Sequence, residues 1–262
     1  MVLMRASLVG SGPAVVLLHG QPGAARDFEE VVPLLAGLSV LAPDRPGYDG
    51  SAAQGFLGNA RAVLDLLDQH AIERAVVCGY SWGGGAALAT ALLAPDRVAG
   101  LTLVASVGVR EAYTSVDRLL ALPAVHAVFE TVMRLGGSRL APLSRVTTGS
   151  ALAEPAESRV REGLQIARHG PAWRSFHREQ VALVRETTQL ERRLHRVSVP
   201  AVLVGGTRDT AVSLRAVHKL AGSLPDAVVR EVDAGHLMTL EAPQAVADAI
   251  RETVVRAGLL GG

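Results

Sequence analysis

The chain has 262 residues, 49% of them hydrophobic, enough to bury a substantial core, and its single cysteine, Cys78, excludes a disulfide framework and a Cys-rich zinc site. The formal net charge of +1 and the lack of a nucleic-acid-binding motif argue against a nucleic-acid partner. No apolar run approaches the ~18 residues of a membrane-spanning helix, and residues 1–10 do not resemble a secretory signal, so we expect a cytoplasmic protein without a membrane span.

Short runs of Val and Leu alternate with longer amphipathic stretches, which is typical of a parallel sheet with crossover helices. The runs are apolar at most positions, as expected of strands buried on both faces. We predict strands at 14–18, 40–42, 75–78, 101–105, 201–204 and 228–232, and helices at 27–37, 57–70, 83–93, 213–224 and 244–257. The fold class is therefore α/β, with a mostly parallel sheet flanked by helices.

The alternation stops between residues 109 and 197, a gap too long for a loop in a compact domain. Helical stretches are predicted within it at 116–135, 157–169 and 173–195. We therefore predict a core of residues 1–109 and 197–262, interrupted by a helical lid of residues 110–196. The lid carries fourteen Arg, no Lys and nine acids. Such charge usually marks solvated helix faces, and an electropositive lid that favours anionic substrates is the alternative.

Residues 79–83 read Gly-Tyr-Ser-Trp-Gly and match the pattern G-x-S-x-G. The apolar residues 76–78 predict a buried strand before it, and the small residues 84–89 predict a helix after it. A sharp turn between the two lifts the Ser81 hydroxyl clear of the backbone, and the flanking glycines avoid a side-chain clash. The pentapeptide alone is a weak signal, and an idle serine in a glycine-rich turn is the alternative. Its context, and two further residues, favour a nucleophile.

Asp209 follows the predicted strand 201–204, and His236 follows the predicted strand 228–232. In open α/β sheets, ligands bind at the edge formed by the carboxyl ends of the strands. A serine hydroxyl needs a base that takes its proton, imidazole can do so near neutral pH, and a carboxylate fixes the imidazole tautomer. We therefore predict Ser81 as the nucleophile, His236 as the base and Asp209 as the acid.

The loop after the first predicted strand reads His-Gly-Gln-Pro-Gly at residues 19–23. We expect the backbone N–H groups of Gln21 and Trp82 to form an oxyanion hole, because rigid amides need no reorganisation. His19 is interpreted as a structural histidine that holds the loop. Gln21, Trp82 and Tyr80 are the candidate residues of a substrate pocket.

Several stretches in this order carry a resemblance to the α/β-hydrolase superfamily, namely HGQPG at 19–23, DRPGYDGS at 44–51, GYSWGG at 79–84, GTRD at 206–209 and AGH at 234–236. The resemblance covers essentially the whole chain and falls in the lidded branch of small esterases, haloperoxidases and C–C bond hydrolases. It implies the α/β-hydrolase fold with a helical lid. Asp49 stands where this branch usually has Gly, and we interpret it as a turn residue. A serine nucleophile argues against the related epoxide hydrolases and haloalkane dehalogenases, which use a carboxylate.

From the motifs and the resemblance together we predict a serine hydrolase that works through an acyl-enzyme on a small-molecule substrate. The expected substrate class is carboxyl esters of small to medium apolar compounds. The alternatives are a C–C bond hydrolase or lyase with the same triad, and a binding or receptor protein with little turnover. An aminopeptidase would need acids in the lid, which is net basic. The sequence shows no metal-ligand spacing and no cofactor fingerprint, so we expect neither metal nor cofactor; the oligomeric state stays open.

Overall fold

The computed structural model describes residues 4–152, 154, 156–169 and 172–260. Its centre is a seven-stranded sheet in the order β1-β3-β2-β4-β5-β6-β7. All neighbouring strands are parallel except β1, which is antiparallel to β3. The strands are β1 Leu8–Val9, β2 Ala14–Leu18, β3 Ser39–Leu41, β4 Ala75–Tyr80, β5 Val98–Val104, β6 Ala201–Gly206 and β7 Ala227–Val232. The predicted mostly parallel sheet is confirmed, and only β1 was not expected.

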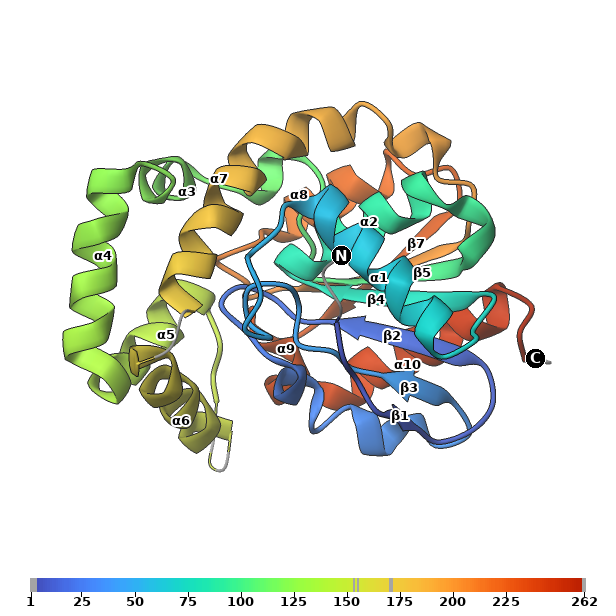
Figure 1. Ribbon diagram of the computed structural model, residues 1–262, viewed down its shortest axis with the longest axis horizontal. Helices are drawn as coiled ribbons and strands as arrows, with labels where there is room; N and C mark the ends of the chain where they lie inside the picture. The colour runs from blue at the N-terminus through green and yellow to red at the C-terminus, as the bar shows by residue number, and fades with distance from the viewer. Residues whose placement is uncertain (1–3, 153, 155, 170–171, 261–262) are drawn as a thin grey trace.

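Helices cover both faces of this sheet (Figure 1). Val16 and Leu18 of β2 share one core cluster with apolar residues of the helices α1 Phe56–Gln69, α2 Trp82–Leu93 and α8 Leu214–Ala221. Val15 and Leu17 alternate with them and face the helix α10 Pro243–Arg256. Because successive side chains of a strand point to opposite faces, one apolar run supplies both cores. This explains why the predicted strands are apolar throughout.

The predicted helix 27–37 is wrong as a single helix. The structure has two short 3₁₀ turns there, Ala25–Phe28 and Val32–Leu35, which pack Phe28 and Leu35 into the same core cluster as α10. Pro33 lies in the first turn of the second element, where its missing N–H is harmless, whereas inside an α-helix it would break the hydrogen-bond ladder.

Among the described residues between β5 and β6, besides short 3₁₀ helices, lie five α-helices, namely α3 Ser115–Leu120, α4 Pro123–Gly136, α5 Ala141–Thr148, α6 Ala156–His169 and α7 Ala172–Glu191. We call these helices and the loops that join them the α3–α7 segment. The predicted helix 116–135 is interrupted at Leu122, because the residue before a proline avoids the helical conformation. Helices α4, α5 and α6 lie beside the sheet at the left of Figure 1, and α7 returns from them to contact α2.

The predicted division into residues 1–109, 110–196 and 197–262 stays a prediction. Residues 1–3, 153, 155, 170–171 and 261–262 of those ranges lie outside the described part of the chain. None of the described helices combines the length and the apolar composition that a membrane crossing requires.

Candidate active site

Ser81 lies in the sharp turn between β4 and α2, with a backbone φ of 52° and ψ of −119°. A non-glycine residue rarely adopts positive φ, so the surrounding backbone must enforce it. The Ser81 N–H donates to Val104 O at 2.8 Å, and the Val107 N–H donates to Ser81 O at 3.1 Å. A Cβ on Gly79 or Gly83 would lie 2.5 Å or less from backbone atoms. Glycine at both positions therefore permits the turn.

The structure brings Ser81, Asp209 and His236 into one hydrogen-bonded line at the carboxyl edge of the sheet. His236 Nε2 lies 2.9 Å from Ser81 Oγ, and His236 Nδ1 lies 2.9 Å from Asp209 Oδ2. The Asp209 side chain is fully buried and that of His236 is 11% exposed. If Nδ1–H donates to the carboxylate, the Nε2 lone pair faces the serine hydroxyl. This arrangement can withdraw the hydroxyl proton.

The second carboxylate oxygen of Asp209 is held by the turn that follows β6. Its Oδ1 accepts the N–H groups of Ala211 and Val212, both at 2.8 Å. Two backbone donors on one oxygen leave the other oxygen aimed at the imidazole. The orientation of the carboxylate is therefore fixed before any reaction begins.

Residues of the α3–α7 segment hold the loop of His236. The His236 N–H donates to Thr148 O at 2.7 Å, and the Leu237 N–H donates to Ser150 Oγ at 2.9 Å. The Tyr80 hydroxyl donates to His236 O at 3.1 Å. No motif marks Thr148 or Ser150, because their role depends on a contact between segments far apart in the chain.

The two expected oxyanion donors flank the serine. Trp82 is the first residue of α2, so its amide has no acceptor inside the helix. Gln21 follows β2, and a Cβ on the preceding Gly20 would lie 3.1 Å from the Ser81 Cβ. The 19–21 loop therefore passes directly beside Ser81. The assignment of both amides to an oxyanion hole stays a prediction.

The Trp82 side chain, a candidate residue of the substrate pocket, is enclosed in the core of this structure. The indole is fully buried, 4.7 Å from the Phe56 ring and 4.5 Å from the Arg45 guanidinium, and its Nε1–H donates to Glu179 O. A ring enclosed in this way has no surface left for a ligand. Tyr80 is 5% exposed and Gln21 is half-buried, so these two candidates stay open.

His19 has the structural role expected of it. The ring donates through Nδ1 to Gly20 O at 2.8 Å and accepts the Arg45 N–H through Nε2 at 2.9 Å. Burial, and then the nearby Arg45 charge, hold the pKa of His19 well below its ordinary value. The histidine is neutral and anchors the 19–21 loop. Asp49 likewise caps its turn, with Oδ1 accepting the N–H groups of Gly47 and Ser51.

A cavity of about 380 Å³ lies between α4, α7 and the loop at residues 50–53. His126, His177 and Arg178 are among its lining residues, but Ser81, Asp209 and His236 are not. The cavity therefore belongs to the α3–α7 segment rather than to the hydrogen-bonded line. Among the residues that the structure describes, no three His, Cys, Asp or Glu side chains gather so that they could hold a metal ion.

Asp27 lies beneath the loop that follows β2, since a Cβ on Gly23 would lie 2.5 Å from the Asp27 Oδ2. Burial raises the pKa of Asp27 to about 6, although the Ala24 N–H donates to the carboxylate. A carboxyl whose pKa is raised on folding favours the folded state at low pH, and this contribution is lost as the pH rises through the folded pKa.

We expect Asp27→Asn to stabilise the protein at pH 7.5 relative to the parent, by up to roughly 3 kcal/mol for a shift of this size, and to have little effect at pH 4. Urea unfolding at both pH values measures the difference. Asp96→Asn, at an exposed position, is the control and should leave the difference unchanged. An effect of Asp27→Asn that is equal at both pH values would contradict the burial of a charged carboxylate.

Comparison with known proteins supports the same fold. The model of the family described as alpha/beta hydrolase fold matches residues 13–243. The pimeloyl-[acyl-carrier protein] methyl ester esterase of Aromatoleum aromaticum is 31% identical over 254 residues, which cover 92% of this chain and 98% of the esterase. The 2-hydroxy-6-oxo-6-phenylhexa-2,4-dienoate hydrolase of Burkholderia cepacia is 39% identical over 105 residues, 36% of this chain and 37% of the hydrolase.

A solved esterase from Thermogutta terrifontis superimposes with a TM-score of 0.79 at 23% identity, over 97% of this chain and 93% of the esterase. At this identity the likeness concerns the fold. The family match, by contrast, spans most of the sequence, including the regions of Ser81, Asp209 and His236. The resemblance found in the motifs is thereby confirmed, and this chain belongs to the alpha/beta hydrolase fold family of enzymes.

Proposed function

We propose that the protein is a serine hydrolase that works through an acyl-enzyme, with carboxyl esters of small to medium apolar compounds as substrates. The observation that carries the proposal is the pair of 2.9 Å contacts that joins Ser81 Oγ, His236 and Asp209 in one line. The 31% identity to the esterase of A. aromaticum supports ester substrates. In this proposal, residues 110–196 form the lid over the site.

The proposed reaction has two halves. Ser81 Oγ attacks the ester carbonyl while His236 Nε2 takes the hydroxyl proton, and the negative charge on the carbonyl oxygen is held by the amides of Gln21 and Trp82. The alcohol leaves with the proton from His236, and the acyl group stays on Ser81. Water then attacks the acyl-enzyme, again giving its proton to His236, and the acid is released with Ser81 restored. Asp209 stabilises the imidazolium in both halves.

Cleavage of a C–C bond is the second candidate, because part of the chain is 39% identical to the dienoate hydrolase of B. cepacia. The same line of side chains would serve it. The two candidates differ in substrate, so turnover of simple esters separates them.

A phosphonofluoridate should label Ser81 rapidly, since its phosphorus forms a bond to an activated serine oxygen with loss of fluoride, whatever the natural substrate is. Peptide mapping identifies the adduct. The activity of the protein on p-nitrophenyl esters of short and medium chain should fall in proportion to the fraction of Ser81 that is labelled. His236→Ala should not be labelled, because its serine lacks a base. The Ser106→Ala variant removes a different buried hydroxyl and should be labelled like the parent.

The absence of an adduct at Ser81, under conditions that fully modify an authentic esterase, would contradict the proposed nucleophile. Fast labelling without activity on any ester would keep the nucleophile and favour C–C cleavage. Slow labelling with a burst of one equivalent and little further turnover would favour the binding protein.

A further inference from the structure

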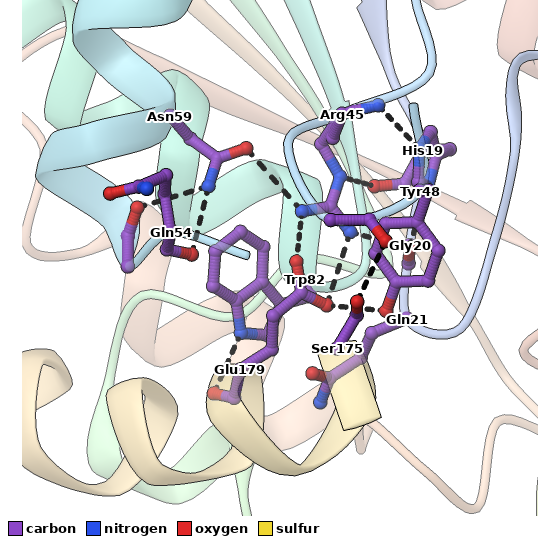
Figure 2. Close-up of polar contacts among 12 residues, drawn as sticks. His19, Gly20, Gln21, Arg45, Tyr48, Gln54, Asn59, Trp82, Ser175 and Glu179 are labelled. Carbon is purple, nitrogen blue, oxygen red and sulfur yellow. Dashed lines mark hydrogen bonds and ion pairs between the residues drawn. The ribbon is translucent and has the colours of Figure 1, made fainter. Parts of the chain in front are cut away.

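A fully buried ion pair joins α7 to the loop after β3. The guanidinium of Arg45 contacts the carboxylate of Glu179 through Nη1, and its Nη2 lies 3.4 Å from Oε2. Neither side chain is exposed at all. Glu179 Oε2 also accepts the Tyr48 hydroxyl at 2.8 Å (Figure 2). Both carboxylate oxygens thus have partners, and these partners, Arg45 and Tyr48, lie in the loop after β3.

The other side of the same guanidinium reaches the loop beside Ser81. Arg45 Nε donates to His19 O and Nη2 donates to Gly20 O, both at 2.7 Å (Figure 2). The next loop residue is also held from α7, since Gln21 Nε2 donates to Gln180 Oε1 at 3.1 Å. Glu179 and Gln180, adjacent on one helix, therefore hold three successive residues of the loop, directly or through Arg45.

The hydrogen bond to Gly20 O orients the following N–H group as well as the carbonyl. The Gly20 C=O and the Gln21 N–H belong to one planar peptide unit, so the direction of one sets the direction of the other. Gly20 O accepts from Arg45 Nη2 and, at 2.8 Å, from His19 Nδ1, and these two donors together aim the Gln21 N–H to the opposite side. The close approach of Gly20 to Ser81 places that amide next to the serine.

Arg45 can serve as this anchor only while its charge is neutralised. A buried guanidinium without a counterion is strongly unfavourable, and it would move toward water or another acceptor. Glu179 supplies the counterion, and burial raises the pKa of its carboxyl while Arg45 opposes that rise. The direction of the Gln21 amide thus depends on a residue of the α3–α7 segment.

We propose that Glu179 is a positioning residue, which acts through Arg45 to aim the Gln21 amide at the developing oxyanion. The inference rests on the proposed serine hydrolase function. In this proposal, α7 helps to position an oxyanion donor in addition to forming part of the lid. Loss of this contact should weaken binding of the transition state and leave binding of the ground-state ester nearly unchanged.

Glu179→Gln tests the proposal, because it keeps the shape of the side chain and removes its charge. We expect kcat on the best ester to fall about 10- to 100-fold, less than the 10²- to 10³-fold cost of deleting an oxyanion donor outright, with KM changed less than about threefold. The inhibition constant of a matching trifluoromethyl ketone, whose serine adduct carries the oxyanion, should rise in proportion to the loss in kcat/KM.

Glu186→Gln is the matched control. Glu186 also lies on α7 and docks it on the core, where its Oε2 accepts the Phe56 N–H at 2.9 Å, but it makes no hydrogen bond or ion pair with the 19–21 loop. We expect its kcat and ketone inhibition constant to stay within about twofold of the parent. Equal losses in both variants would show that α7 docking alone matters, and would overturn the positioning role.

The double variant Arg45→Met/Glu179→Leu covers the case in which Glu179→Gln does not fold. Apolar replacement of a whole buried ion pair is often neutral or stabilising, so this variant should fold, yet Gly20 O loses its guanidinium donor. We expect the same loss in kcat and in ketone affinity. A folded double variant with parental kcat would overturn the proposal. Retained ester turnover in Ser81→Ala would instead overturn the proposed serine mechanism on which the inference rests, whatever Glu179→Gln shows.

Discussion

Ser81→Ala is expected to lower kcat about 10⁶-fold, the loss found when the serine of a comparable triad is removed. Its Oγ is the atom 2.9 Å from His236 Nε2, and no other hydroxyl among the described residues has a hydrogen bond to that nitrogen. The fold should be retained, because the Ser81 backbone contacts to Val104 and Val107 do not involve the side chain. Ester turnover by purified protein, with circular dichroism as the check on folding, measures the effect.

Ser106→Ala is the matched control for this change. Ser106 is a second buried serine just beyond β5, and its hydroxyl donates to Val107 O at 2.7 Å. Its loss removes a buried hydrogen bond close to the same turn without touching His236. We expect its kcat to stay within a few-fold of the parent. Retention of more than a few per cent of activity in Ser81→Ala would exclude Ser81 as the nucleophile.

The sheet could be predicted because both of its faces are covered. Strands such as 14–18 and 201–204 are apolar at nearly every position, and few other structures need that pattern. Less could be predicted where short-range signals conflict. Residues 25–35 have apolar residues at helical spacing but also Pro33, and the structure resolves the conflict with two 3₁₀ turns. Strand β1 has two exposed residues, too few to show a period.

The residues of the hydrogen-bonded line could be located because each follows a strand end within a short motif. Their supporting residues could not, because Thr148, Ser150 and Glu179 lie in the segment whose packing the sequence does not specify. One signal for Glu179 was present, since it stands three residues after Phe176 and four before Leu183, on the buried face of α7. An acid at an apolar position predicts a buried partner, but not which one.

The surroundings of the Trp82 side chain could not be predicted either. Its position beside Ser81 in the sequence suggested a pocket wall. The direction of the side chain, however, depends on the orientation of helix α2, which the sequence does not specify. Here the indole packs between Phe56 and Arg45 inside the core. The side chain therefore has its own partners in the core, whereas the role of the backbone amide as an oxyanion donor stays a prediction.

Asp209→Asn is expected to lower kcat about 10⁴-fold, the scale of the corresponding change in a known triad. Asp209 Oδ1 accepts two backbone N–H groups, so the amide oxygen of an asparagine must take that place, and its NH₂ must face His236. A donor there forces Nδ1 to accept, which moves the ring proton to Nε2. The nitrogen that should take the Ser81 proton then already carries one, although every heavy atom stays in place.

Steady-state ester kinetics measure this loss, and His236→Ala should be more damaging, because it removes the base rather than its tautomer. Asp233→Asn is the matched control, since Asp233 is an exposed carboxylate of the neighbouring loop that pairs with Arg208 at 2.9 Å. It should leave kcat within about twofold, as exposed ion pairs contribute little. A silent Asp209→Asn would mean that another carboxylate orients His236. Strand β5 lies between β4 and β6 and ends at the same edge of the sheet, but residues 105–110 after it include no acid.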